Sequence, residues 1–132
     1  MLAEPDRFVR FTLENMVFEY DEEKNRQNIA KHGISFRNAA RVFLDYDRIE
    51  RYDVAHSMEE DRFNTIGDTS PGNLVTIGNL TESAVMVNDI LFVVYTERIA
   101  LSEHGKMIDV TRLISARLAT NFERGLYYGK HS

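Results

Sequence analysis

The spacing of apolar residues divides the first third of the chain into one strand and two helices. Met16 to Tyr20 is a short run of β-branched and aromatic residues, which predicts a strand. Asp21 then predicts a helix N-cap, and Gly33 is the residue expected just past the helix end, near His32. Ser35 predicts the N-cap of a second helix, whose apolar residues recur at the spacing of one buried stripe: Phe36, Ala39, Ala40 and Phe43.

The middle of the chain predicts strands separated by turns. Arg48 to Val54 favours a strand weakly, and Arg62 to Gly67 favours one more strongly. Residues 70–73 have the chemistry of a turn, an extended run follows at 74–80, and residues 84–87 are apolar without a clear period. For residues 1–14 we expect an N-terminal extension, because their apolar residues follow no firm period.

Two apolar segments close the chain. Ile90 to Thr96 is almost continuously apolar, which predicts a central strand buried on both faces, and residues 102–106 join it to Ile108–Ile114 in a hairpin. Ser115 predicts the N-cap of a last helix, whose apolar stripe is Leu118, Ala119, Phe122 and Leu126. This order of elements predicts a small α+β fold in one domain over residues 15–130: an antiparallel sheet with two N-terminal helices and a C-terminal helix packed on one face.

The composition fits a small globular domain. The chain has 132 residues, of which 43% are hydrophobic and 28% charged, and a chain of this length buries about 70% of its unfolded surface. The absence of cysteine excludes disulfides and cysteine nucleophiles and fits a reducing cytoplasm. No apolar run approaches about 20 residues, so we expect a cytoplasmic protein without a membrane span or signal peptide.

Charge is distributed unevenly along the chain. The net charge of −5 argues against nucleic acid as a partner. However, Lys24 to Leu44 holds five basic residues and no acid, and the tail from Arg112 has four basic residues against Glu123 alone. Seven acids lie between them, in residues 45–61. Two interpretations remain open: solvated helix faces, or a local site for an anion.

The candidate chemistry lies in histidine, arginine and carboxylate side chains at the ends of elements. His32 ends a helix, and Arg62 faces away from the core if Phe63 faces into it. Arg117 lies in the first turn of the predicted last helix, where a cation gains nothing from the dipole. Arg112 shares a face with apolar residues, so it either reaches to an edge or pairs with a carboxylate such as Glu97.

These residue types suit RNA cleavage without a metal ion. That reaction needs a base for the 2′-hydroxyl proton, cations for the charge that develops on phosphorus, and an acid for the leaving oxygen. The four histidines are scattered without the spacing of metal ligands, so we expect no metal site and no cofactor. The same residue types also make ordinary salt bridges.

Four blocks of sequence, in order, resemble the BrnT family of toxins. They include Phe18–Asp21 with Lys31–Phe36, then Glu60–Phe63, then Val93–Arg98, and last Arg112–Arg117. The resemblance implies a RelE-like ribonuclease fold and the toxin half of a type II toxin–antitoxin pair. It implies RNA cleavage that blocks translation, neutralisation by a BrnA-type antitoxin, and contact with operator DNA only through that antitoxin. A homodimer, or a heterotetramer with the antitoxin, is compatible with it.

The resemblance also assigns roles to residues. The family's catalytic positions correspond to Lys31, His32, Arg62, Arg98 and Arg117, with Glu60 or Glu97 as the carboxylate. We expect RNA contacts from the two basic segments: Lys24, Arg26, Arg112, Arg124 and Tyr128. The alternative function is that of a catalytically inactive family member that binds protein or nucleic acid.

Overall fold

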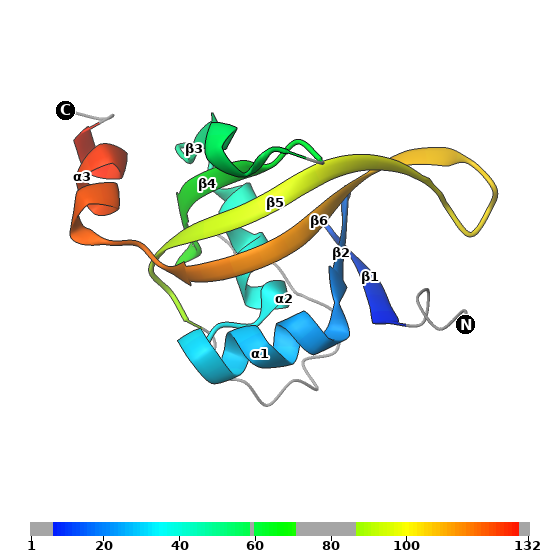
Figure 1. The fold of residues 1–132 in the computed structure, drawn as a ribbon, viewed down its shortest axis with the longest axis horizontal. Helices are drawn as coiled ribbons and strands as arrows, with labels where there is room; N and C mark the ends of the chain where they lie inside the picture. Colours follow the sequence, from blue (N-terminus) through cyan, green and yellow to red (C-terminus); the bar gives the residue numbers. More distant parts are fainter. Residues whose placement is uncertain (1–6, 59, 71–86, 130–132) are drawn as a thin grey trace.

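The chain folds into a six-stranded mixed sheet with three α-helices (Figure 1), in a computed structural model that describes residues 7–58, 60–70 and 87–129. The expected turn after Ser70, the extended run at 74–80 and the apolar residues 84–86 lie outside these ranges. The elements in chain order are β1 (Phe8–Leu13), β2 (Met16–Asp21), α1 (Glu22–His32), α2 (Phe36–Ala39), η2 (Ala40–Leu44), β3 (Ile49–Tyr52), η3 (Val54–His56), β4 (Phe63–Asp68), β5 (Ile90–Leu101), β6 (Met107–Leu118) and α3 (Asn121–Gly129).

The sheet has the strand order β1-β2-β6-β5-β4-β3, and one pair of strands in it is parallel. β2 runs parallel to β6, whereas every other neighbouring pair is antiparallel. The prediction of an antiparallel sheet is therefore wrong at this pair. Parallel neighbours need a long connection, and here two helices and three strands separate β2 from β6 along the chain.

Residues 8–13, expected within an extension, form the edge strand β1 and pair with β2. Phe11 and Leu13 are buried while Arg10 and Thr12 are exposed, so this strand alternates with a period of two. Six residues are too short for that alternation to stand out before the partner strand is known.

The predicted helix caps in the first third are confirmed. Asp21 accepts hydrogen bonds from the backbone of Glu23 and Lys24, Gly33 has the left-handed φ of 73°, and Ser35 caps α2. α2 is one turn long and continues as the 3₁₀ helix η2, so the second helix is shorter than its apolar stripe predicts. All four residues of that stripe are buried: Phe36, Ala39, Ala40 and Phe43.

The last helix begins later than predicted. Ser115 and Arg117 lie in β6, because β6 stays paired with β5 as far as Leu118. α3 starts after Thr120, whose hydroxyl accepts from the backbone of Glu123 while the Glu123 carboxylate accepts from the backbone of Thr120. This reciprocal pair is a capping box, and the Thr-x-x-Glu spacing is visible in the sequence.

Helices cover both faces of the sheet, contrary to the prediction of a single covered face. One core joins β2, β5 and β6 to the α1–η2 segment through residues that include Phe18, Phe36, Val93 and Leu113. On the opposite face, Tyr127 of α3 and Ala119, which precedes that helix, pack against Ile66 and Ile90. We call this opposite side of the sheet the open face.

α3 leaves the middle of β5 partly exposed on the open face. Leu91, Val93 and Tyr95 point into the core, whereas Phe92 and Val94 on the open face are only half-buried. The prediction that β5 is buried on both faces is therefore wrong at Phe92 and Val94, although Ile90 and Thr96 on the same face are buried. Among the described helices, none is long and apolar enough to cross a membrane.

Replacing Asn28 by leucine tests how α1 is attached to the sheet. The buried Asn28 amide donates to the carbonyl oxygens of Ile34 and Ala116 and accepts from the backbone N–H of Ala116. We expect Asn28→Leu to lower the free energy of unfolding by about 2–4 kcal/mol, because each buried group left unpaired costs about 1–3 kcal/mol. Urea denaturation measures this, with Gln27→Leu on the exposed side of α1 as the control; equal stability of both variants would contradict it.

Candidate functional site

A hollow of about 420 Å³ lies on the open face, between the β3–β4 connection and β6. We call it the sheet hollow. Its wall combines apolar side chains of β5 with polar and charged side chains from the connection, β4 and β6. The lining residues are Asp53, His56, Arg62, Asn64, Phe92, Val94, Ile114, Ser115 and Arg117.

The connection between β3 and β4 is closed by hydrogen bonds at its base. The backbone N–H of Asp53 donates to the carbonyl of Arg62 at 2.8 Å. The hydroxyl of Ser57 donates to the carbonyl of Asp53 and accepts from the backbone N–H of Arg62. These bonds hold the loop residues 53–58 against the start of β4, so His56 and Arg62 reach one site from either end of the loop.

His56 and Asp53 form an acid–histidine pair. The 3₁₀ helix η3 brings side chains three residues apart onto the same line, and His56 Nδ1 lies 3.0 Å from Asp53 Oδ2. With its proton on Nδ1, the imidazole donates to Asp53 and presents Nε2 as a base. Sequence reasoning missed this pair, although Asp-x-x-His was a visible signal for it in a helical turn.

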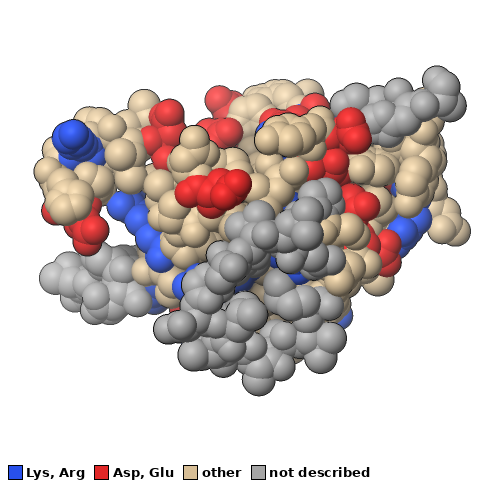
Figure 2. Space-filling view, turned by 180° about the vertical axis from the view of Figure 1, so that it is seen from behind, with Lys and Arg blue, Asp and Glu red and all other residues tan. Residues whose placement is uncertain are grey.

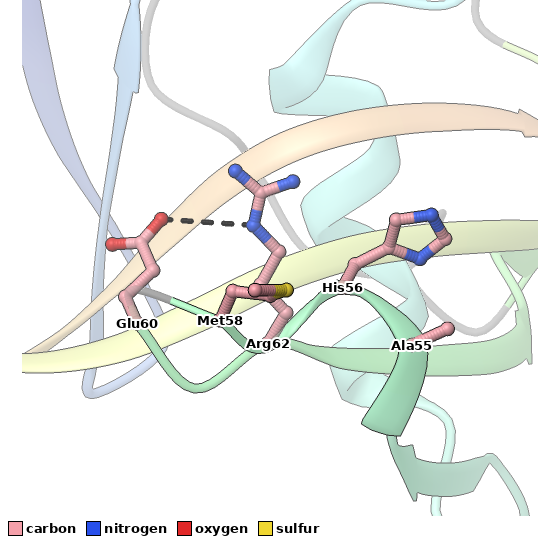
Figure 3. A pocket seen from close by; sticks show the side chains of 5 residues that line it. All are labelled: Ala55, His56, Met58, Glu60 and Arg62. Atoms are coloured by element: carbon pink, nitrogen blue, oxygen red, sulfur yellow. Dashed lines mark ion pairs between the residues drawn. The ribbon is translucent and has the colours of Figure 1, made fainter.

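Arg62 stands between Glu60 and His56, as Figure 3 shows, and Arg62 Nε lies 3.7 Å from a Glu60 carboxylate oxygen. The side chain of Arg62 is 34% exposed, so its guanidinium remains accessible to a ligand. Together with Ala55 and Met58, these three residues line a second hollow that shares His56 and Arg62 with the sheet hollow. The structure therefore brings the predicted residues Glu60 and Arg62 together.

Arg117 reaches the sheet hollow from β6, not from a helix. Its guanidinium lies over the Phe92 ring at 4.2 Å and makes two hydrogen bonds to the Glu123 carboxylate, at 2.8 and 2.9 Å. The hydrogen bond from Arg117 holds the pKa of Glu123 below its usual range, and the same bond raises the pKa of Arg117. Glu123 at the start of α3 therefore orients an arginine of the sheet.

Arg98 and Arg112 lie elsewhere on the open face, bound to Glu19 of β2. A carboxylate holds Arg112, as one of the two alternatives predicted, but this carboxylate is Glu19 and not Glu97. Glu97 instead accepts a hydrogen bond from the Thr111 hydroxyl. β2 was expected only as an early strand, and its parallel pairing with β6 is what places Glu19 directly opposite Arg112.

The other predicted site residues lie away from the sheet hollow. Lys31 and His32 are in the last turn of α1, on the far side of the sheet, with Lys24 and Arg26 on the same helix. Arg26 pairs with Glu23, Arg124 of α3 pairs with Asp89, and Tyr128 is an exposed side chain of α3.

The surface behind the sheet carries both acidic and basic side chains (Figure 2). β5 and β6 cross in front of α2 in Figure 1. Seen from behind in Figure 2, acidic side chains lie mainly in the upper part of the visible surface, and several basic side chains lie close together near its left side. The sheet hollow places two arginines beside a histidine. Within the described ranges, no group of three or more His, Asp or Glu side chains is placed to hold a metal ion.

The sheet hollow can carry out acid–base chemistry on an anion. A histidine held by a carboxylate can take a proton, and two guanidinium groups can hold a phosphate through their planar forks.

A family model described as "Ribonuclease toxin, BrnT, of type II toxin-antitoxin system" matches residues 20–86, which is 67 of the 132 residues. A comparison with curated proteins found no match. The matched segment includes Asp53, His56 and Arg62, whereas β5 and β6 follow it.

Replacing Glu123 by glutamine tests the ion pair with Arg117. Because the pKa of Glu123 is lowered in the folded state, its contribution to stability is complete above its ordinary pKa of 4.5 and is lost as the pH falls through the lowered value. We expect Glu123→Gln to lower the free energy of unfolding at pH 7 by about 1–2 kcal/mol. The difference from wild type should shrink at pH values below 4.5. Thermal unfolding across this range measures it, with the exposed Glu103→Gln as the control; a difference independent of pH would contradict the ion pair.

Proposed function

The chain belongs to the BrnT family of ribonuclease toxins of type II toxin–antitoxin systems, and we propose that it cleaves RNA in the sheet hollow without a metal ion. The observation that carries this proposal is the convergence of His56, Arg62 and Arg117 on one hollow of the open face. A base and cations at one site are two of the three requirements of metal-free RNA cleavage, the third being an acid for the leaving oxygen.

In the proposed reaction, His56 Nε2 accepts the proton of the 2′-hydroxyl while the 2′-oxygen forms a bond to phosphorus. The bond from phosphorus to the 5′-oxygen breaks, a water molecule protonates the leaving oxygen, and the hydroxide that remains takes the proton from the His56 imidazolium. Asp53 holds the imidazole in the required orientation and stabilises the imidazolium that forms. The proposed general base is His56, and the catalytic role that the resemblance implies for His32 stays a prediction.

The two arginines stabilise the negative charge that develops on the phosphate oxygens. Arg62 approaches from the β3–β4 connection, and Arg117 approaches from β6. Glu60 and Glu123 position these guanidinium groups. A guanidinium has five N–H donors, and Glu123 engages two nitrogens of Arg117, so donors remain for a phosphate.

A toxin of this family has an antitoxin partner, and for this chain we propose a BrnA-type antitoxin in the cytoplasm that contacts operator DNA itself. The simplest neutralising complex covers the arginines of the open face with acidic side chains, since complementary charges steer association. A partner strand could instead pair with β1 or β3, which are the two edges of the sheet. A lower association rate at high salt would favour the first arrangement.

One observation favours the second function, a binding module without turnover. Glu123 already makes a bidentate pair with Arg117 and so competes with a phosphate for that guanidinium. Expression in a bacterium that lacks the antitoxin separates the two functions: growth arrest supports the toxin, and unaffected growth with abundant folded protein supports the module.

Replacing His56 by alanine tests the proposed base. We expect His56→Ala to slow RNA cleavage about 10²–10⁴-fold, the usual contribution of general acid–base catalysis. The measurement uses purified protein and labelled RNA in excess EDTA, in which the wild type should remain active. His104→Ala is the matched control, because His104 is an exposed histidine in the β5–β6 turn. Cleavage by His56→Ala at the wild-type rate would remove His56 from the mechanism, and wild-type activity that needs an added divalent metal would contradict metal independence.

Replacing Arg62 by alanine tests the proposed phosphate contact. We expect Arg62→Ala to abolish growth arrest while changing the free energy of unfolding by less than about 0.5 kcal/mol, as for most partly exposed residues. Arg37→Ala is the control, because Arg37 lies on α2, on the far side of the sheet from the hollow. Retained toxicity would exclude Arg62 from the site, and a large loss of stability would make its role structural.

A further inference from the structure

A second group of arginines lies on the open face, and the proposed reaction does not use it. The group includes Arg98, so the catalytic role that the resemblance implies for Arg98 is not part of that reaction. Arg10 of β1, Arg98 of β5 and Arg112 of β6 converge on the carboxylate of Glu19 in β2, at nitrogen–oxygen distances of 3.1, 3.0 and 2.6 Å. Four neighbouring strands of the sheet thus contribute one residue each. We call these four residues the arginine cluster.

The arginine cluster holds more positive charge than its carboxylate needs. The Glu19 side chain is 3% exposed, and one guanidinium in a two-pronged pair would neutralise it and bind both of its oxygens. Three guanidinium groups around one carboxylate leave two net positive charges. They also offer fifteen N–H donors in total, whereas a carboxylate accepts about four hydrogen bonds. The neighbouring pair Arg7–Asp21 adds no net charge.

The cluster is both held in place and open to solvent. Arg112 lies over the Phe8 ring at 4.1 Å, and Arg10 also donates to the carbonyl of Leu101. The side chains of Arg10 and Arg98 are 38% exposed. These arginines are therefore ordered before a ligand arrives, which reduces the entropy that binding costs.

We propose that the arginine cluster binds a phosphate of the RNA strand other than the one that is cleaved. This inference rests on the proposed function, because it extends the binding site from the sheet hollow along the same face. On β5, Val94 lines the sheet hollow and Arg98 lies four residues further along the same side, about 13 Å away at the rise of a strand. Two phosphates at these places belong to different nucleotides, so the RNA runs along β5 and β6.

The Arg98→Gln, Arg112→Gln double variant tests the subsite. Each phosphate contact with a single strand contributes about 0.7 to the slope of log affinity against log salt concentration. In a His56→Ala background, which should bind RNA without cutting it, we expect the double variant to lower that slope by about 0.7, because it removes the contact with one phosphate. Affinity should fall about 10-fold or more, since a hydrogen bond to a charged group is worth about 1.5–3 kcal/mol. Fluorescence anisotropy with labelled single-stranded RNA measures both, and Arg37→Gln on α2 is the control on the far side of the sheet.

Cleavage kinetics separate a remote subsite from a part of the catalytic centre. With His56 intact, the double variant should raise KM about 10-fold and leave kcat unchanged, because a remote contact stabilises bound substrate and transition state equally. A fall in kcat with unchanged KM would place the cluster at the reacting phosphate and overturn the proposal. If the double variant does not fold, Arg98→Gln alone keeps two arginines on Glu19 and should lower the salt slope by at most about 0.7.

The remaining outcomes distinguish the subsite from the proposed function. RNA cleavage by the wild type, with binding unaltered in a folded double variant, overturns the subsite alone. RNA binding that depends on the cluster, without cleavage by the wild type, overturns the proposed function and supports the subsite. If the double variant no longer binds a polyglutamate peptide but still binds RNA, the cluster binds an acidic protein partner. That outcome overturns the RNA subsite.

Discussion

The antiparallel pairing of β5 with β6 is the interaction on which the rest of the structure depends. The two strands pair from Leu91–Leu118 to Leu101–Met107, the longest ladder in the sheet. On one side this ladder carries apolar residues that pack against α2 and η2, and on the other it carries Arg98, Arg112 and Arg117. A shift of its register by one residue would exchange these two faces. The same pairing therefore sets both the core and the open face.

Carboxylates hold the arginines of the open face in position. Glu60 pairs with Arg62, Glu123 with Arg117, and Glu19 with three arginines. This arrangement explains how a chain with a net charge of −5 can present cations to an anion. Charge counted along the sequence adds the pairing acids and the free surface acids together, whereas a ligand meets the local field of ordered guanidinium groups. The pairing acids lower the net positive charge of the open face, and they hold its guanidinium groups in fixed positions.

α3 defines where the open face ends. The Thr120–Glu123 capping box starts the helix, and Tyr127 reaches the Asp45 carboxylate at the other side of the small core. Burial and the hydrogen bond to Asp45 raise the pKa of Tyr127, so this hydroxyl stays protonated as a donor. α3 therefore covers one end of the face and sends Glu123 to Arg117, so a packing element of the fold also orients a residue of the proposed site.

Local chemistry along the chain was enough to predict the features that depend on near neighbours. The caps at Asp21 and Ser35, the left-handed Gly33 and the buried stripe from Phe36 to Phe43 are confirmed, because each arises within a few residues. The resemblance likewise predicted the family, which the match over residues 20–86 shows. Arg62 with Glu60 was predicted from one short block, and the loop that holds them is also local.

Only the tertiary structure decided which distant residues meet. The edge strand β1, the parallel β2–β6 pair and the continuation of β6 to Leu118 all depend on partners far along the chain. Ser115 is followed by a helix-like stripe, but pairing with β5 outweighs that local preference and keeps Arg117 in a strand. Glu19 meets Arg98 across 79 positions for the same reason. The periodicity of one segment predicts which of its sides is buried. Strand pairing determines which residues of different segments lie next to each other.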